Sequence, residues 1–222
     1  MGSEDVYKRQ AQTVTLSGVN DNDRDRHQDY KISLIAADQY TGAPEVTTLA
    51  GSGSTGSTNA TGTSARFNYP RSIISDGTNL YVADRSNHAI RKIVISTGAV
   101  TTIAGSAGST GSTNAIGTSA RFNAPYGITS DGTNLYVADR GNHMIRKIVI
   151  STGAVTTLAG STSSGSTDAN GGLAYFKNPT GLTIDGSNLY VVDSENHMIR
   201  KLDLRGTVTA NVAMHNLDDD TD

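Results

Sequence analysis

The sequence predicts an all-β fold built from the blades of a β-propeller, and three observations lead to that prediction. A segment of 39 residues that starts at Arg66 recurs from Arg121 with 32 identical positions, and a third copy starts at Tyr175. Within the copies, short stretches rich in Ile, Val, Tyr and Thr alternate with turn signals, as β-strands do. No segment keeps the 3.6-residue apolar period of a long helix. Four antiparallel strands per repeat, stacked against like neighbours, form a propeller blade.

The first two expected strands of each repeat are joined by a tight turn. In the first copy they cover residues 72–75 and 79–84, with Asp76-Gly77 between them. Asp-Gly pairs supply the positive φ that hairpin turns need, so we expect a hairpin at the start of every blade. The pair recurs as Asp131-Gly132 and Asp185-Gly186.

The third and fourth strands of the first copy are expected over residues 90–95 and 99–104, on either side of Gly98. The second strand is apolar on both faces, which suits a sheet covered on both sides. The fourth strand carries Thr101 and Thr102, which tolerate water better, so we expect it to lie outermost. The blades are then expected over residues 46–104, 105–159 and 160–204. Residues 46–51, VTTLAG, match the end of a repeat whose beginning is absent.

Three segments identify the type of repeat: NLYVADRSNHAIRKI, NLYVADRGNHMIRKI and NLYVVDSENHMIRKL. Each follows a segment that contains Pro and Asp-Gly, and together they resemble the NHL repeat over residues 46–204. The resemblance implies blades of a propeller that usually closes with six. Three blades make only an arc, so the ring is expected to be incomplete or to be completed by oligomerisation. A homodimer would supply six blades.

The segments outside the blades differ in composition and are expected to be separate β segments. Residues 1–10 read as a leader foreign to the fold. Residues 11–45 and 205–222 contain TVTLSGVNDNDRDRHQDYKISL and GTVTANVAMHNLDDDTD, which resemble two halves of a Calx-β-like sandwich module. That resemblance implies that the blades are inserted into the module, although a junction made during sequence assembly would give the same pattern.

Acidic clusters in these flanks are candidate calcium ligands. Alternating carboxylates in a turn converge on one hard cation, and a Calx-β-like module would bind calcium at its end loops. The alternative is a solvated charged loop. The candidate ligands are Asp21, Asp23, Asp25, Asp218, Asp219 and Asp220.

Three histidines recur once per repeat, at the turn between the second and third strands. A shared zinc site would need three His side chains around one ion, but rotated copies of one position lie too far apart. We expect each histidine to stabilise its own turn, through a hydrogen bond with the aspartate four residues before it. The pairs are Asp84 and His88, Asp139 and His143, and Asp193 and His197.

Four arginines are expected beside turns that share one rim of the propeller, where they would bind an acidic or glycan ligand. They are Arg66, Arg85, Arg121 and Arg140. The alternative is that they are ordinary exposed arginines, with Arg91, Lys92 and their copies along the blade edges. Phe67, with its copies at residues 122 and 176, is expected to wedge between blades.

The composition argues against several classes of function. A net charge of +2 over residues 45–203 and the lack of an aromatic stacking set argue against nucleic acid. No apolar run approaches the roughly 18–20 residues of a membrane span, no signal peptide is visible, and there is no Cys. We expect a non-enzymatic module of a surface or secreted protein that presents a propeller rim to protein or glycan ligands. The alternative is a lyase-like or lactonase-like propeller enzyme with an axial metal.

Overall fold

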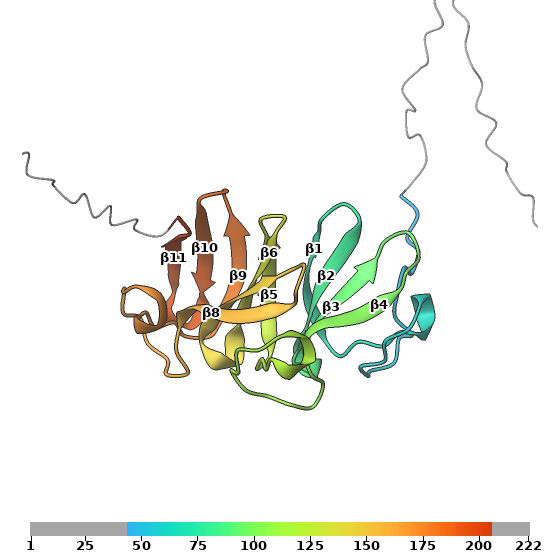
Figure 1. Ribbon diagram of the computed structural model, residues 1–222, viewed down its shortest axis with the longest axis horizontal. Helices are drawn as coiled ribbons and strands as arrows, with labels where there is room; N and C mark the ends of the chain where they lie inside the picture. Colours follow the sequence, from blue (N-terminus) through green and yellow to red (C-terminus); the bar gives the residue numbers. More distant parts are fainter. Residues whose placement is uncertain (1–43, 206–222) are drawn as a thin grey trace, which may run out of the picture. The chain divides into compact units, whose positions relative to one another are not determined.

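The computed structural model describes residues 44–205. The chain divides into two compact units, Met1–Val46 and Thr47–Asp222. Of the first unit only residues 44–46 are described, and they form no helix or strand. The described part of the second unit contains three antiparallel sheets that follow one another along the chain (Figure 1). The predicted all-β fold of propeller blades is therefore confirmed, and these sheets are called blades 1, 2 and 3.

Each strand lies close to its predicted position, and each sheet keeps its strands in sequence order. Blade 1 consists of β1 (Pro70–Ser75), β2 (Asn79–Asp84), β3 (Ala89–Val94) and β4 (Val100–Gly105). Blade 2 consists of β5 (Pro125–Ser130), β6 (Asn134–Asp139), β7 (Met144–Val149) and β8 (Ala154–Gly160). Blade 3 consists of β9 (Pro179–Ile184), β10 (Asn188–Asp193) and β11 (Met198–Asp203).

Blade 3 has three strands within residues 44–205, so the prediction of four strands holds for blades 1 and 2 only. The reason lies in the frame of the repeats. The fourth strands β4 and β8 contain VTTIAG and VTTLAG, whereas β11 is followed by Leu204 and Arg205. The third VTTLAG precedes blade 1 at residues 46–51 and forms no strand there.

Within residues 44–205, six short 3-10 helices join the strands. Each blade has one before its first strand and one between its second and third strands. They are η1 (Gly62–Ser64), η2 (Arg85–Asn87), η3 (Gly117–Ser119), η4 (Arg140–Asn142), η5 (Gly171–Leu173) and η6 (Ser194–Asn196).

The predicted Asp-Gly hairpins are present at all three places. Gly77 has φ 88°, in the left-handed region that glycine adopts without strain. The Asp76 carboxylate accepts hydrogen bonds from the backbone N–H of Thr78 and Asn79 and from the Tyr81 hydroxyl at 3.0 Å. The turn is thus fixed to the strand that follows it.

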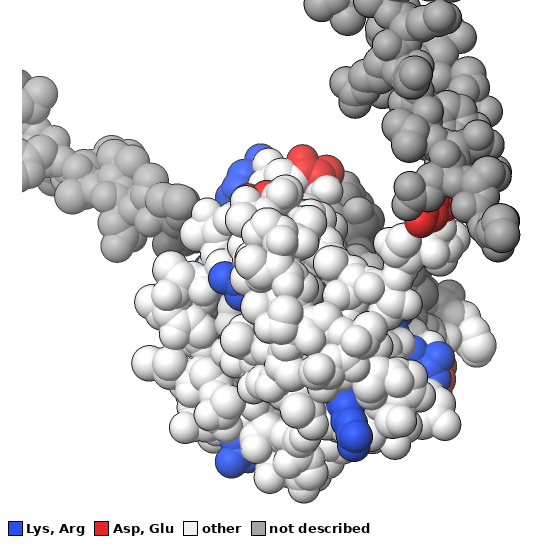
Figure 2. Space-filling model, turned by 90° about the vertical axis from the view of Figure 1, so that its right-hand side faces the viewer, with Lys and Arg blue, Asp and Glu red and all other residues white. Residues whose placement is uncertain are grey.

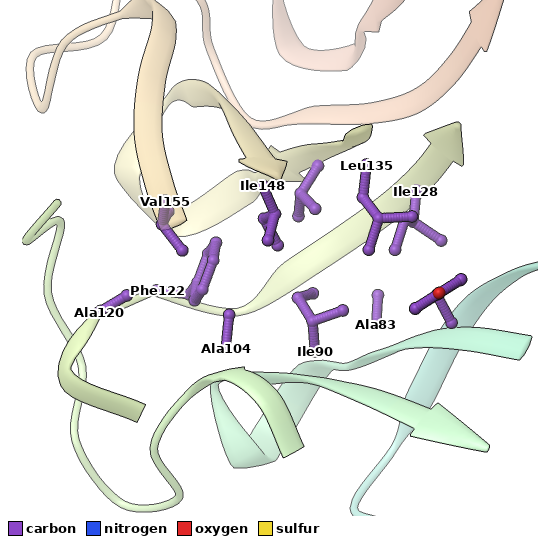
Figure 3. Close-up of a cluster of buried hydrophobic side chains, with 11 residues drawn as sticks. Ala83, Ile90, Ala104, Ala120, Phe122, Ile128, Leu135, Ile148 and Val155 are labelled. Atoms are coloured by element: carbon purple, nitrogen blue, oxygen red, sulfur yellow. The ribbon is translucent and has the colours of Figure 1, made fainter. Parts of the chain in front are cut away.

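The apolar core lies between the blades rather than within one sheet. One cluster joins Tyr81, Ala83 and Ile90 of blade 1 to Phe122 and other residues of blade 2 (Figure 3). A second cluster joins blade 2 to blade 3 in the same manner around Phe176. Both phenylalanines are fully buried, so their predicted place as wedges between blades is confirmed.

The first strands of successive blades pack against one another on the inner side, β1 on β5 and β5 on β9. Their backbones approach closely, because a Cβ added to Gly127 of β5 would lie 2.0 Å from the carbonyl oxygen of Thr180. The fourth strands β4 and β8 form the outer edges of blades 1 and 2, as their threonines predicted.

Candidate functional site

Each blade contains a buried ion pair between the end of its second strand and its third strand. In blade 1 the Asp84 carboxylate accepts hydrogen bonds from Arg91 Nη1 at 2.8 Å, from Asn87 Nδ2 at 2.7 Å and from the backbone N–H of Asn68. The expectation that Arg91 and its copies lie exposed along the blade edges is wrong, since Arg91 and Arg146 are buried. The pair recurs as Asp139–Arg146 and Asp193–Arg200.

The buried arginine holds the connection between blades in place. Arg91 donates to the carbonyl oxygens of Thr58 and Arg66 and to Asn59 Oδ1, and its guanidinium lies 5.1 Å from the centroid of the Phe67 ring. Because these partners belong to the segment that enters the blade, the arginine clamps that segment onto the sheet. The signal that marks it in the sequence is an aspartate, an asparagine three residues later and an arginine four residues after that, repeated in each copy.

The histidines cross from one blade to the next. His88 follows η2 with φ 52°, and its Nδ1 accepts a hydrogen bond from the backbone N–H of Ala124 in blade 2 at 3.0 Å. His143 accepts the same bond from Asn178 in blade 3. At His88 and His143 the expected hydrogen bond to the aspartate is therefore replaced, because Asn and Arg side chains occupy that carboxylate. Burial lowers the pKa of His88, and the neighbouring Arg85 cation lowers it further.

The 3-10 helices η2, η4 and η6 form one surface with the starts of β1, β5 and β9, and we call it the turn face. In blade 1 the backbone N–H of Ser86 donates to the carbonyl oxygen of Asn68, which fixes η2 beside the start of β1. Equivalent bonds hold η4 and η6. The turn face is thus held by backbone hydrogen bonds in all three blades.

The part of the turn face on blades 1 and 2 combines arginine with tyrosine. Arg71 lies over the Tyr126 ring, 5.4 Å from its centroid, and Tyr69 is largely exposed beside it in the sequence. Within residues 44–205, neither Arg71 nor Arg85 forms an ion pair, and the buried Arg85 Nε has no hydrogen-bond partner. Cationic and aromatic groups are therefore left for a ligand on this surface.

An acidic side chain lies at the boundary between blades 2 and 3 of the turn face. Glu195 lies 3.5 Å from Arg140 Nη2 and 3.9 Å from Lys177 Nζ, so one carboxylate offsets part of the charge of two cations. Within residues 44–205, the arginines of the turn face that form no ion pair, Arg71 and Arg85, both belong to blade 1.

The structure separates the four arginines of the predicted rim into two places. Arg85 and Arg140 begin η2 and η4 and belong to the turn face. Arg66 and Arg121 lie on the connections that enter blades 1 and 2, where Arg121 donates to the carbonyl oxygens of Thr118 and Ala120. Arg71 and Tyr126, which the sequence reasoning missed, occupy one position per repeat without being identical, so repetition did not mark them.

The candidate calcium ligands at positions 21, 23, 25, 218, 219 and 220 lie outside the described residues. In the part of the chain that is described, no group of three His, Cys, Asp or Glu side chains is placed to hold a metal ion. No helix of that part is long and apolar enough to cross a membrane.

No family model matches the chain. The chain is similar to NHL repeat-containing protein 2 of Homo sapiens, with 35% identity over 141 residues, which is 56% of this chain and 19% of that protein. It is also 31% identical over 134 residues to the protein SUPPRESSOR OF QUENCHING 1, chloroplastic, of Arabidopsis thaliana, covering 56% of this chain and 13% of that protein. These similarities confirm the resemblance to NHL repeats, and the chain spans no more than about a fifth of each relative's length.

Solved structures give the same fold. An auxiliary nutrient binding protein from Bacteroides thetaiotaomicron matches with a TM-score of 0.50 and 26% identity, covering 60% of this chain and 36% of that one. A second protein from that organism, described as a structural genomics protein of unknown function, matches with a TM-score of 0.52 and 26% identity over 55% of this chain and 32% of that one. The chain is thus similar to part of each larger protein, and the fold is one that supports a binding or scaffolding role.

Proposed function

We propose that this protein is a non-enzymatic binding module and that the turn face of blades 1 and 2 binds an acidic glycan. The observation that carries the proposal is the combination of Arg71, stacked on Tyr126, with Arg85 and the exposed Tyr69. Arginine recognises carboxylates through paired N–H donors, and tyrosine offers an apolar ring with a polar hydroxyl. An acidic sugar presents both the carboxylate and the ring face that such a surface fits.

The rigidity of the surface supports a binding role. The 3-10 helices are held by backbone hydrogen bonds to the starts of the inner strands, so the surface loses little conformational entropy when a ligand binds. A solved relative by structure is named a nutrient binding protein, which agrees with this role. A surface or secreted location, expected from the sequence, stays a prediction.

The test is isothermal titration calorimetry of the full chain with polygalacturonate, with neutral dextran as the comparison. We expect binding to polygalacturonate only, and we expect Arg71→Ser combined with Arg85→Ser to weaken it at least about tenfold, because each hydrogen bond to a charged group contributes roughly 1.5–3 kcal/mol. Arg66→Ser is the matched control, since Arg66 is exposed but belongs to the connection that enters blade 1, outside η2 and β1.

Two results would contradict the proposal. The first is no binding to polygalacturonate. The second is an equal loss of affinity in the Arg66→Ser control and in the double variant, which would mean that only net charge matters. Poly-glutamate serves as the third probe, and binding to it without binding to polygalacturonate would assign an acidic protein, rather than a glycan, to this surface.

A further inference from the structure

The two ends of the blade unit expose apolar side chains that the middle of the unit buries. Ten large apolar side chains are exposed among residues 44–205, and seven of them lie in the VTTLAG segment, in or next to β1, or in β10 and β11. These seven are Val46, Leu49, Tyr69, Ile73, Val192, Met198 and Ile199. The equivalent residues of the other blades are buried by a neighbouring strand or blade. Ile199 is 71% exposed, whereas Ile90 and Ile145 at the equivalent positions are 0% exposed.

Within residues 44–205, the outer edge of blade 3 is a strand without a partner, and it lies beside a groove. In blades 1 and 2 the third strand pairs with a fourth, β3 with β4 and β7 with β8. In blade 3 the described residues give β11 no such partner, and a groove of about 1010 Å³ runs along Met198–Leu204 instead. Leu158, Ala174 and Phe176 line its apolar side.

Among the described residues, one copy of the fourth-strand sequence lies outside a sheet. The leading segment, residues 46–51, reads VTTLAG, which is identical to the last six residues of β8 and differs from β4 only at Leu49. The register of β4 on β3 pairs Ala89 with Gly105 and Ile93 with Val100. Transferred to blade 3, it places Gly51 opposite Met198, Thr47 opposite Lys201 and Val46 opposite Leu202.

We propose that the leading segment of a second copy of this chain forms the fourth strand of blade 3. Within one chain, the leading segment and blade 3 lie at opposite ends of the row of blades, because β1 packs on β5 and β5 packs on β9. In a dimer with a twofold axis, each chain adds its leading segment to blade 3 of the other chain. The two chains are then joined head to tail, and neither blade 1 nor blade 3 remains an open end. The backbone hydrogen bonds of the added strand supply the pairing, as in other cases of strand addition.

The blade surfaces that this exchange brings together are complementary. The face of blade 1 that points away from blade 2 carries Leu80, Val82 and Ile93, equivalent to the three residues of blade 2 that complete the cluster between blades 1 and 2. Residues of the segment that enters blade 1, Ala50, Ala60 and Phe67 among them, pack against this face. Within residues 44–205 no neighbouring blade adds its strands to the face, and Val192 and Ile199 of a second copy would do so. The end of the unit formed by blade 1 is largely free of charged side chains (Figure 2).

The histidine bond between blades gives an independent argument. His88 bonds to the backbone of Ala124 and His143 to that of Asn178, so each histidine is paired with the residue before the next blade's first proline. The next such residue for His197 is Tyr69 of a second copy. Tyr69 has φ 51°, matching Ala124 at 53° and Asn178 at 50°, so its backbone is already in the conformation that accompanies the bond.

The first test is the mass of the full chain by size-exclusion chromatography with light scattering. We expect twice the chain mass of 23.2 kDa for the unaltered protein and the single chain mass for Val46→Asp. Val46 is 95% exposed in one chain, but its copies Val100 and Val155 are 3% and 2% exposed, so a carboxylate there is buried only in the dimer. Thr47→Lys is the matched control and should stay dimeric, since Thr101 and Thr156 are exposed even when paired.

A second test reports the register directly, because the chain has no cysteine of its own. Oxidation of Thr47→Cys combined with Lys201→Cys should yield a covalent dimer on a non-reducing gel. The control pair is Thr47→Cys with Lys92→Cys, which should give no covalent dimer on the same gel because Lys92 already faces Thr101. A monomeric unaltered chain, an equal effect of Val46→Asp and Thr47→Lys, or an intrachain disulfide in the Lys201 pair would overturn the proposal. Tyr69 takes part in both proposals, whereas Arg71 and Arg85 belong only to the ligand surface, so a failure of the dimer leaves the test with the Arg71 and Arg85 variant standing.

Discussion

A buried arginine in the third strand of each blade is stabilised by several hydrogen-bond acceptors rather than by one counter-ion. Arg146 is paired with Asp139 at 2.8 Å and also donates to two backbone carbonyls and to Asn114. Its Nε is the exception and has no partner among the described residues. Arg200 of blade 3 uses its Nε to contact Asp168, which stands where the other blades have asparagine. Burial of this charge is thus compatible with stability because its remaining donors are satisfied.

The histidine at the end of η2 links stability to pH. His88 accepts a hydrogen bond through Nδ1, so the neutral ring is the form that the fold binds, and burial lowers its pKa below the usual 6.5. The unfolded chain takes up a proton near pH 6.5 while the folded chain resists it. Stability is therefore fully present above that pH and falls as the pH drops below it.

We expect His88→Asn to flatten this pH dependence. Asparagine tolerates the left-handed conformation and offers an amide oxygen to the Ala124 N–H, but it does not titrate. Urea unfolding at a series of pH values from 8 to 5.5 measures the free energy of unfolding of both proteins. At pH 8 the histidine is neutral, so the difference there gives the effect of the substitution apart from titration. Parallel stability curves for the two proteins would show that His88 does not contribute to the dependence.

At the scale of the elements, the inner strands depend on small residues where they meet. Gly127 of β5 faces the backbone of β9, and an added Cβ would lie 2.0 Å from the carbonyl oxygen of Thr180. Backbone cannot move aside as a flexible side chain can, so Gly127→Ala must push β5 and β9 apart. We expect a loss of roughly 1–3 kcal/mol in the free energy of unfolding, as for overpacking in general.

Gly172→Ala is the matched control for this prediction. Its nearest neighbour would be the Gly160 carbonyl oxygen at 3.9 Å, which is ordinary contact, and Gly172 does not have a left-handed φ. Thermal unfolding of both variants beside the unaltered chain measures the difference. The close approach of β5 and β9 would be refuted if Gly127→Ala were as stable as the control.

At the scale of the whole molecule, the repeats made the fold predictable from the sequence. They made the candidate site predictable only in part. Strand order, hairpins and the Phe122 wedge follow from local patterns that each copy repeats. The burial of Arg91 was not predictable from one side chain, because its partners come from the segment some 30 residues earlier. The turn face was missed for a related reason: Arg71 and Tyr126 become neighbours only when blades 1 and 2 stack.

The position of each blade in the arc sets its expected resistance to local unfolding. Blade 2 packs on a neighbour through two apolar clusters, whereas blades 1 and 3 each have one shared cluster. In repeat arrays, stability is close to a sum of repeat and interface contributions, so the middle repeat should open least often. In the monomeric Val46→Asp variant we therefore expect the amides of β7 to exchange hydrogen slowest and those of β11 fastest.

Hydrogen exchange with mass spectrometry tests this gradient with an internal control, because β3, β7 and β11 share the sequence IRK at one register. Equivalent peptides have similar intrinsic exchange rates, so differences between them report the blade environment. In the unaltered chain, pairing with a second copy should slow hydrogen exchange in β11 to a rate closer to that of β7. The N–H groups at the outer edge of β11 then donate to carbonyl oxygens of the added strand. Uniform protection across the three strands of the monomeric variant would mean that the blades unfold as one unit, with no contribution from the number of neighbours.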